Sequence, residues 1–427
     1  MELLIRGGKI IDPSQKLDEK KDLLIEDGKI KAIEKPGKIP VSSVRKIIEA
    51  KGFWVLPGLI DIHVHLREPG FEYKETLETG SRAAIAGGFT SIACMANTFP
   101  VNDSASITAF IREKAKASAL CRVFPIGAVS KGLKGEELAE IGGMVEAGAR
   151  AISDDGMTVM NSYLMRKAME YSKAFGIAVI SHAEDSNLVG LGMMNEGPLS
   201  TELGLRGNPA AAEEILVARD IALCRLTRSP IHIAHLSTKV ALDHVIRAKE
   251  AGLPVTAEVT PHHLTLTDQS LRDYSTHYKM APPLRSEKDV EALHEGLARG
   301  YIDMIATDHA PHSINDKALE FDQAANGITG LQTAVSVTLA LVHNKTISSK
   351  RWVESMTLSP AKFLGIPHGT LKKGTVADIT LLDPNEIWVY KEDQVLSKSK
   401  NSPFIGRKFR GRIKATLLGG KIVFGEV

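Results

Sequence analysis

Two histidines one residue apart, His63 and His65, end an apolar segment that reads "GLIDIHVHLREPG" over residues 58–70. Alternate side chains of a strand share one face, so the odd-numbered residues from Asp61 to Arg67 are predicted to point one way and the even-numbered residues the other. Two imidazoles on one face can bind a single divalent cation. The alternative is a pair of histidines that contact only each other or solvent.

Metal-binding residue types also stand at the ends of other apolar runs. They are Asp154 and Asp155 (run 149–155), His182 (177–184), His235 (230–237) and Asp308 (301–309). Barrel enzymes carry their sites where the carboxyl ends of the strands meet. Unpaired buried carboxylates are costly, and coordination to zinc-like cations relieves that cost. These residues, taken together, therefore predict a metal centre.

Some neighbouring histidines fit this centre less well. His232 lies three residues from His235, so strand parity predicts that only one of the two enters the barrel, and His235 is nearer the mouth. His262 and His263 end another run, where they could support the ligands through hydrogen bonds.

The elements that must position these residues can be read from the same sequence. Eight short runs alternate with helical patterns, and they cover residues 59–66, 90–98, 122–130, 149–155, 177–184, 230–237, 255–262 and 301–309. Amphipathic patterns such as 162–176 and 238–252 lie between them and close with glycine, as helix ends do. Eight such units predict an α/β protein with a closed parallel (β/α)₈ TIM barrel; a doubly wound open sheet is the alternative.

Both ends of the chain show a different pattern. Residues 1–56 and 366–427 contain short alternating runs with "DGK" and "GGK" turns, which are typical of antiparallel hairpins. We predict that these segments form one composite β-sandwich domain beside a barrel of residues 57–365. Two helical stretches, 330–344 and 349–365, are predicted to lead from the last barrel strand back to this domain.

The composition argues against several classes of partner. The 427 residues include 53 Lys and Arg against 51 Asp and Glu, so no basic field indicates binding to nucleic acid. No apolar run reaches the length of about 18 residues that spans a membrane, and charges interrupt the first ten residues where a secretion signal would be apolar. Three widely spaced cysteines are typical of reduced core residues, and we expect a cytoplasmic protein that acts on a small molecule.

The ordered set of motifs resembles one known family. "DIHVHLREPG", "MANT", "SDDG", "SHAED", "HIAHLS", "APPLR" and "ATDHAPH" are similar to the motifs of dihydroorotases of the bacterial class I type, within the metal-dependent amidohydrolase superfamily. The resemblance extends over nearly the whole chain. It implies the barrel and composite β-sandwich described above, and an enzyme that interconverts N-carbamoyl-L-aspartate and (S)-dihydroorotate in pyrimidine (UMP) biosynthesis.

The resemblance also implies a role for each metal-type residue. The implied ligands are His63 and His65 for one zinc ion, His182 and His235 for a second, Asp155 as the bridge and Asp308 on the first ion. One or two ions per subunit fit this set, and two are favoured. Because coordination lowers the pKa of water to about 7, a metal-bound hydroxide would attack the ring amide carbonyl. Asp308 would act as the catalytic proton shuttle to the leaving ring nitrogen.

Further residues are implied to bind the substrate. Arg67 suits bidentate capture of the substrate carboxylate, and Asn97 and His312 would assist it. The stretch 313–330 resembles the mobile active-site loop of the family, and its "AANGITG" segment contributes Asn326 and Gly327. Many family members have Asn where "KMAPPLR" has Ala281, so a hydrogen bond to the substrate is missing or comes from the backbone.

Related functions and other classes remain open at this point. Hydantoinases, dihydropyrimidinases and allantoinases share the fold, but they typically bridge their metals with a carboxylated lysine, and the run "GARAISDDG" has none. Dihydrouracil also offers no carboxylate to Arg67. An inactive scaffold homologue is a third alternative, although such a protein should have lost ligands. The resemblance leaves open a homodimer and an association with aspartate transcarbamoylase.

Overall fold

All eight predicted barrel strands are present in the computed structural model, which describes residues 2–41 and 44–427. They are β6 (Leu59–Val64), β7 (Phe89–Cys94), β8 (Arg122–Pro125), β9 (Ile152–Ser153), β10 (Val179–Ser181), β13 (Ile231–Ile233), β14 (Val255–Val259) and β15 (Met304–Ile305). They form two parallel sheets, β6-β7-β8 and β15-β14-β13-β10-β9. Parallel bridges between Val64 and His309 and between Gly127 and Ile152 join the two sheets into a closed barrel. The predicted (β/α)₈ barrel is confirmed, and the open sheet is excluded.

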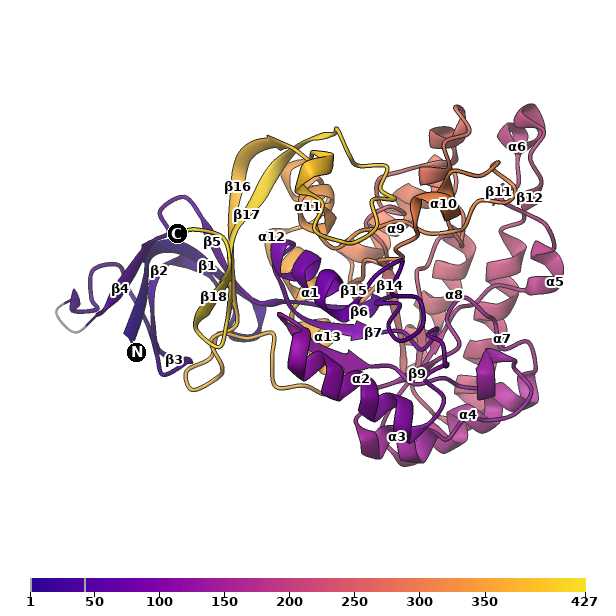
Figure 1. Ribbon diagram of the computed structural model, residues 1–427, viewed down its shortest axis with the longest axis horizontal. Helices are drawn as coiled ribbons and strands as arrows, with labels where there is room; N and C mark the ends of the chain where they lie inside the picture. Colours follow the sequence, from indigo (N-terminus) through magenta and orange to yellow (C-terminus); the bar gives the residue numbers. More distant parts are fainter. Residues whose placement is uncertain (1, 42–43) are drawn as a thin grey trace.

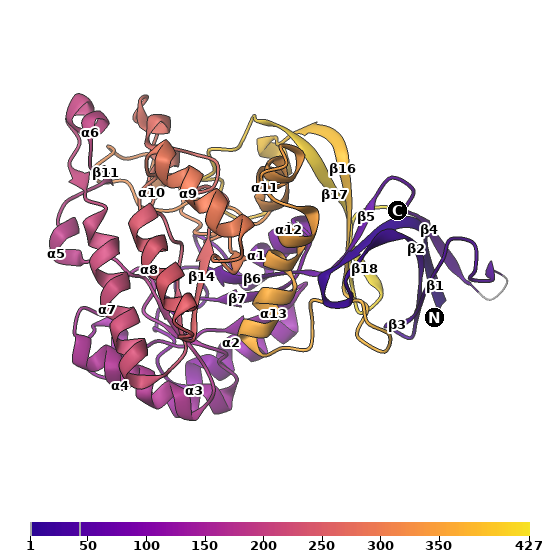
Figure 2. The same ribbon diagram turned by 180° about the vertical axis from the view of Figure 1, so that it is seen from behind.

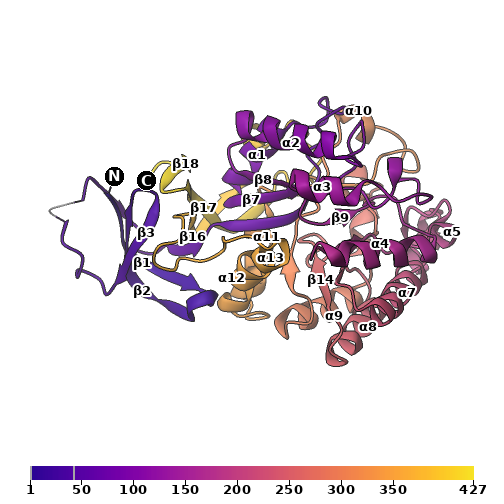
Figure 3. The ribbon, with the colours of Figure 1, turned by 90° about the horizontal axis from the view of Figure 1, so that it is seen from below.

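Helices surround these strands, as Figures 2 and 3 show. They are α1 (Leu77–Ala86), α2 (Ala105–Ser118), α3 (Ile141–Ala147), α4 (Ser162–Ala174), α7 (Ala211–Thr227), α8 (Lys239–Glu250) and α9 (Glu287–Ala298). Local capping explains where two of them begin: the side chain of Asn161 accepts backbone N–H bonds at the start of α4, and that of Thr238 does so at the start of α8. Among the described residues, no helix is long and apolar enough to cross a membrane.

Smaller elements lie in the connections. The segment between β10 and α7 contains α5 (Ser186–Val189), β11 (Met194–Asn195), α6 (Pro198–Leu203) and β12 (Gly207–Asn208). The loop after β15 contains α10 (Ile314–Lys317). Short 3₁₀ helices occur at Pro13–Gln15, Lys131–Leu133, Asp268–Leu271, Thr276–Tyr278 and Glu392–Gln394.

The two helical stretches after the barrel are also present, with one difference. The first forms α11 (Ala334–His343), but the second divides into α12 (Ser349–Met356) and α13 (Leu358–Leu364). The division occurs because Thr357 leaves the helical region, with φ −135° and ψ −76°. Ala361 and Leu364 of α13 pack with Ile60 and Ile62 inside the barrel, so this end of the barrel is filled by apolar side chains.

The two ends of the chain form one eight-stranded sheet beside the barrel (Figure 1). Its strands are β1 (Glu2–Asp12), β2 (Leu17–Glu26), β3 (Lys29–Glu34), β4 (Lys46–Glu49), β5 (Trp54–Pro57), β16 (Ile379–Val389), β17 (Lys408–Leu418) and β18 (Lys421–Phe424). The order is β18-β17-β16-β5-β1-β2-β3, and β4 also pairs with β1. Side chains from both ends share one core, in which Ile5 and Ile25 pack in the same cluster as Ile379 and Leu417. The predicted composite domain is therefore present, while its exact boundaries stay a prediction.

Candidate metal centre

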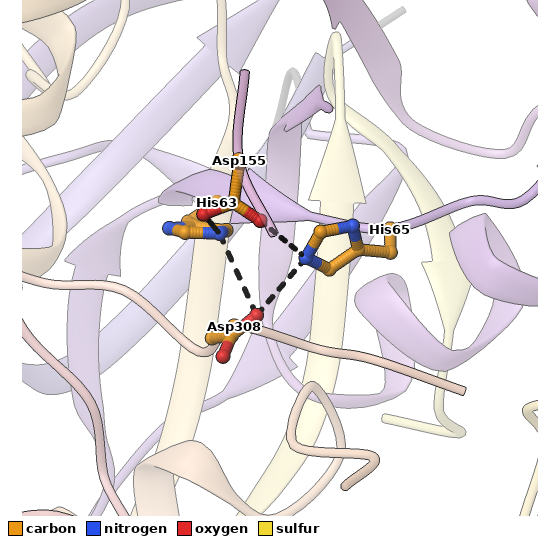
Figure 4. Close-up of side chains that lie close together, drawn as sticks. All are labelled: His63, His65, Asp155 and Asp308. Atoms are coloured by element: carbon orange, nitrogen blue, oxygen red, sulfur yellow. Dashed lines mark hydrogen bonds and ion pairs between the residues drawn. The ribbon is translucent and has the colours of Figure 1, made fainter. Parts of the chain in front are cut away.

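Four side chains converge where β6, β9 and β15 end (Figure 4). The Nε2 atom of His65 lies 3.3 Å from Oδ2 of Asp155 and 3.0 Å from Oδ1 of Asp308. The Nε2 atom of His63 lies 3.3 Å from Oδ1 of Asp155 and 3.5 Å from Oδ1 of Asp308. These four ligand atoms all lie within 4.8 Å of one another, and all four residues are buried.

A second group shares Asp155 with the first. His182 Nδ1 lies 3.5 Å from Oδ1 of Asp155, and His235 Nε2 lies 3.4 Å from the same oxygen. The two imidazoles approach each other to 2.9 Å, between Nδ1 of His182 and Nε2 of His235. The structure thus brings together the six side chains that the sequence singled out, with Asp155 between two sets of histidines.

The donor atoms fit zinc. Among the described residues, His63 Nε2 and Asp155 Oδ1 are buried and have no hydrogen-bond partner, so both are free to bind a cation. Imidazole nitrogens with carboxylate oxygens are a zinc-type set, whereas magnesium and calcium prefer oxygen alone. Four ligands at about 2.0 Å from one zinc ion are about 3.3 Å apart, which matches the separations within the first group.

The ionisation states of the histidines and carboxylates in this centre depend on one another. Although burial disfavours a charged imidazole, the carboxylates of Asp155, Glu258 and Asp308 raise the pKa of His63 well above its ordinary value. Burial opposes ionisation of Asp155 and Asp308 as well, yet the histidines lower the pKa of both carboxyl groups. Both carboxylates are therefore ionised at neutral pH, as metal ligands must be.

Glu258 is a buried partner of this centre that the sequence analysis missed. Its Oε1 atom lies 2.5 Å from Nδ1 of His63 and accepts the backbone N–H of His235 at 3.3 Å. Its Oε2 atom lies 3.2 Å from Nε2 of His232, whose Nδ1 contacts the hydroxyl of Thr256 at 2.8 Å. Burial opposes its ionisation, but His63 and His232 lower the pKa of Glu258 to about 2. The sequence did contain a signal for this partner, because a carboxylate in the middle of the apolar run 255–262 is unusual unless it serves a buried site.

Two expectations from strand parity are wrong. His232 and His235 both lie inside the barrel, His232 against Glu258 and His235 against Asp155, because the backbone of His235 has a positive φ of 31° that breaks the alternation after β13. On β6 the pairing with β7 shifts between Asp61 and Val64, so Ile62 packs inside the barrel with Ile60, and not with Val64. The Asp61 carboxylate does not join the ligands but accepts the backbone N–H groups of His63 and Thr307.

Asp154 also stays outside the ligand group. One oxygen of its carboxylate accepts the backbone N–H groups of Val129 and Ser130 at 2.7 and 3.0 Å, and the other accepts the hydroxyl of Ser130. These bonds tie the end of β9 to the loop after β8, and so they support the position of the neighbouring Asp155.

Positively charged groups gather at one side of the centre. Nη2 of Arg67 lies 3.4 Å from Nε2 of His312, and Nζ of Lys74 lies 3.3 Å from the Nδ1 atom of the same ring. Burial, Arg67 and Lys74 lower the pKa of His312 to about 2, so this imidazole is neutral. Arg67 has a positive φ of 62° and donates from Nε to the Pro311 carbonyl at 3.3 Å. An anion beside these cations would be strongly stabilised.

The remaining predicted substrate residues lie in three places. Oδ1 of Asn97 lies 2.8 Å from Nδ1 of His65, so Asn97 contacts the metal group directly. Gly327 lies beside His312, and a Cβ atom at Gly327 would come within 2.6 Å of the Ala310 side chain. Asn326 is exposed and Ala281 is half-buried.

The two histidines after β14 differ in their hydrogen-bond partners. His263 bonds to the Thr260 hydroxyl and to the Pro282 carbonyl, so it supports the loop. His262 is buried and its Nε2 atom has no partner among the described residues. Burial lowers its pKa to about 4, which keeps the ring neutral.

Comparison with known proteins identifies relatives along the entire chain. Residues 52–241 match a family model described as dihydro-orotase-like. A dihydroorotase from Geotalea daltonii is 53% identical over 423 residues, which are 99% of each chain. A dihydroorotase from Syntrophus aciditrophicus is 49% identical over 427 residues, the whole of both chains.

Solved structures with a similar fold are cyclic amidohydrolases. An L-hydantoinase (dihydropyrimidinase) from Arthrobacter aurescens superposes with a TM-score of 0.90 at 26% identity, covering 100% of this chain and 97% of that one. A D-hydantoinase (dihydropyrimidinase) from a Thermus species superposes with a TM-score of 0.83 at 28% identity, covering 98% and 94%.

Proposed function

The chain belongs to the dihydroorotase family of cyclic amidohydrolases, and on that premise we propose how its side chains carry out the reversible cyclisation of N-carbamoyl-L-aspartate to (S)-dihydroorotate and water, a step of pyrimidine biosynthesis. The observation that carries the proposal is the convergence of six buried metal-type side chains at the carboxyl end of the barrel, with Asp155 common to both groups.

Zinc is the proposed cofactor, with two ions per subunit favoured over one. His63, His65 and Asp308 would hold the first ion, and Asp155 would bridge it to a second. His182 and His235 would complete the second set. When bound, zinc supplies a Lewis acid that polarises the ring carbonyl and lowers the pKa of water to about 7.

Asp308 is the proposed catalytic residue that moves the proton. Its pKa is lowered by His63 and His65 despite burial, so the carboxylate can accept a proton from the attacking water. In hydrolysis the same carboxylate then delivers that proton to the departing ring nitrogen, and in cyclisation it runs the transfer in reverse. The positive φ of Asp308, 46°, turns the chain where β15 ends and directs this residue toward the histidines.

The substrate carboxylate is proposed to bind between Arg67, His312 and Asn97. Arg67 provides the planar pair of donors that matches a carboxylate, and the neutral ring of His312 can contribute a further hydrogen bond. The backbone at Ala281 and Gly327 and the side chain of Asn326 are proposed to line the same end. The side chain that Ala281 lacks would be replaced there by main-chain groups.

A hydantoinase-type activity is the second candidate, favoured by the solved structures with a similar fold. Two features of this chain favour dihydroorotate. The segment around β9 offers Asp155 and no lysine for the bridging place. Arg67 is half-buried at the mouth of the site with no carboxylate partner among the described side chains, so a substrate carboxylate would neutralise it.

Other features remain predictions. The three cysteines are free and buried, which supports a reducing compartment such as the cytoplasm. A homodimer, an association with aspartate transcarbamoylase and the domain boundaries 1–56, 57–365 and 366–427 rest on the sequence and the resemblance alone.

The test is turnover of the zinc-loaded protein on dihydroorotate beside dihydrouracil, hydantoin and allantoin, with metal content measured on the same sample. We expect activity on dihydroorotate alone and two zinc equivalents. Arg67→Met should raise KM for dihydroorotate about 100-fold, since a bidentate charged contact is lost. Equal activity on hydantoin or dihydrouracil, or an unchanged KM in Arg67→Met, would favour the second candidate.

A further inference from the structure

The connection between β16 and β17 reaches from the terminal sheet to the mouth of the barrel (Figure 1, yellow). The hydroxyl of Ser397 donates to the Glu75 carboxylate, which also accepts the backbone N–H of Lys398 at 3.2 Å. Two residues later, the hydroxyl of Ser399 donates to the Lys74 carbonyl at 2.6 Å. This part of the terminal domain therefore contacts the barrel loop between β6 and α1 through specific hydrogen bonds.

Asn401, in the same connection, is buried and forms hydrogen bonds to the barrel. Its Nδ2 group donates to the carbonyls of Ala310 and Gly327 at 2.9 and 3.1 Å, and its Oδ1 atom accepts the backbone N–H of His312 at 3.0 Å. Its own carbonyl accepts the N–H of Thr329 at 2.9 Å. The side chain is 2% exposed, so water cannot readily replace these bonds.

The groups that Asn401 holds belong to two separate stretches of the active site. Ala310 and His312 follow the proposed proton shuttle, whereas Gly327 and Thr329 belong to the loop that follows α10. The two stretches meet closely, because the N–H of Ala310 donates to Ile328 at 2.8 Å and the space at Gly327 is too small for a side chain. Asn401 therefore fixes the separation between His312 and Gly327.

A buried lysine supports the other side of the same loop. The ammonium of Lys317 donates to the carbonyls of Ala325 and Gly327 at 2.7 and 3.1 Å, and to that of Lys279 at 3.3 Å. The Gly327 carbonyl thus receives one bond from the barrel loop and one from Asn401. Of these two donors, only Asn401 also contacts the backbone of His312 among the residues that the structure describes.

We propose that Asn401, contributed by the terminal domain, is a positioning residue that sets His312 and the loop at Gly327 at the substrate carboxylate, so that the active site is completed by both domains. The inference rests on the proposed function, because it concerns the carboxylate end of that site. The hydrogen bonds of Asn401 within the described part of the chain go to Ala310, His312, Gly327 and Thr329 and to none of the six metal-type side chains, so its effect should fall on substrate binding and leave the metal in place.

The alternative is that the connection only fastens the two domains together. Loss of Asn401 would then lower stability without a selective effect on substrate. The two roles differ in the quantities they change, because a fastening role affects the amount of folded enzyme while a positioning role raises KM of the enzyme that is folded.

Asn401→Ala and Asn401→Asp test the proposal. The first removes every side-chain bond; the second keeps an acceptor for His312 but loses both donated bonds and adds a negative charge. We expect KM for dihydroorotate and for N-carbamoyl-L-aspartate to rise by about 10- to 50-fold. We also expect kcat within about threefold of the wild type and an unchanged zinc content. Asn385→Ala, which removes an exposed side chain of β16 whose hydrogen bond among the described residues is to Arg410, is the matched control and should keep the wild-type KM.

Several outcomes would overturn the proposal. They are an unchanged KM in a folded Asn401 variant, or a fall in kcat together with loss of zinc. If Asn401→Ala does not fold, Asn401→Asp is measured in the same way, and an unchanged KM in that folded variant refutes the proposal. Arg67→Met distinguishes a failure of the role of Asn401 from a failure of the proposed carboxylate site. A raised KM in Arg67→Met alone rejects only the role of Asn401, whereas an unchanged KM in all variants rejects the proposed carboxylate site as well.

Discussion

Replacing Glu258 by Gln should weaken zinc binding while leaving the protein folded. Gln has the same shape, and its remaining oxygen can still accept from His63 Nδ1 and from the backbone of His235. The negative charge that faces the imidazole of His63 at 2.5 Å is lost. That charge favours the tautomer of His63 in which Nδ1 carries the proton and Nε2 is free for the metal.

The hydrogen bonds of Glu258 determine how much zinc affinity the substitution should remove. A hydrogen bond to a charged group contributes about 1.5–3 kcal/mol and a neutral one about 0.5–1.5 kcal/mol, so the short bond to His63 should lose about 1–1.5 kcal/mol. The longer bond to the His235 backbone, 3.3 Å, should lose less. Zinc affinity should therefore fall by about 10-fold or slightly more at the ion held by His63, within the range found for such partners.

The assay is titration of the metal-free protein with zinc against a chromophoric chelator, which yields a Kd for each ion. Cobalt substitution adds a visible spectrum that responds to ligand geometry. Asp12→Asn is the matched control, because Asp12 is equally buried but accepts from Ser14 and Leu371 in the terminal sheet. Unchanged zinc affinities and an unchanged cobalt spectrum in folded Glu258→Gln would refute the reasoning.

Two further predictions concern catalysis and pH. Asp308→Ala should retain most of its zinc through the other ligands and lose turnover by about 100-fold or more, and a rate above about a tenth of the wild type would remove Asp308 as the proton shuttle. Burial and Lys279 lower the pKa of Lys317 from 10.5 to about 7 in the folded protein. The unfolded chain therefore binds more protons between these values, so the free energy of unfolding should rise with pH from about 7 to 10. Denaturant titrations at several pH values should show this rise in the wild type and not in Lys317→Met; parallel curves would contradict it.

Local sequence patterns were sufficient for the barrel and for the ligand types. Strand runs and helix caps are decided within a few residues, which is why α4 begins at the Asn161 cap and α8 at the Thr238 cap, as the amphipathic patterns indicate. His182 and Asp308 could be found because a polar residue at the end of a buried strand is unusual unless it serves the site.

Other features could not be read from local patterns. The division between α12 and α13 at Thr357 is an exception, because Pro360 announces it: a proline has no N–H to bond four residues back and fits only the first turn of a helix, where it lies in α13. The positive φ values of Arg67, His235 and Asp308 contradict the ordinary preference of these residue types, so strand parity wrongly predicted that only one of His232 and His235 enters the barrel.

The sequence by itself determined the barrel, the composite terminal domain and the chemistry of the ligands, because these follow from periodicity and from residue type. The tertiary structure alone decided which distant groups hold the ligands and the substrate loops in place. Glu258 meets His63 across 195 positions, and Asn401 meets Gly327 across 74. Hydrogen bonds between such distant residues depend on closure of the barrel and on docking of the terminal domain, and no local preference encodes either of them.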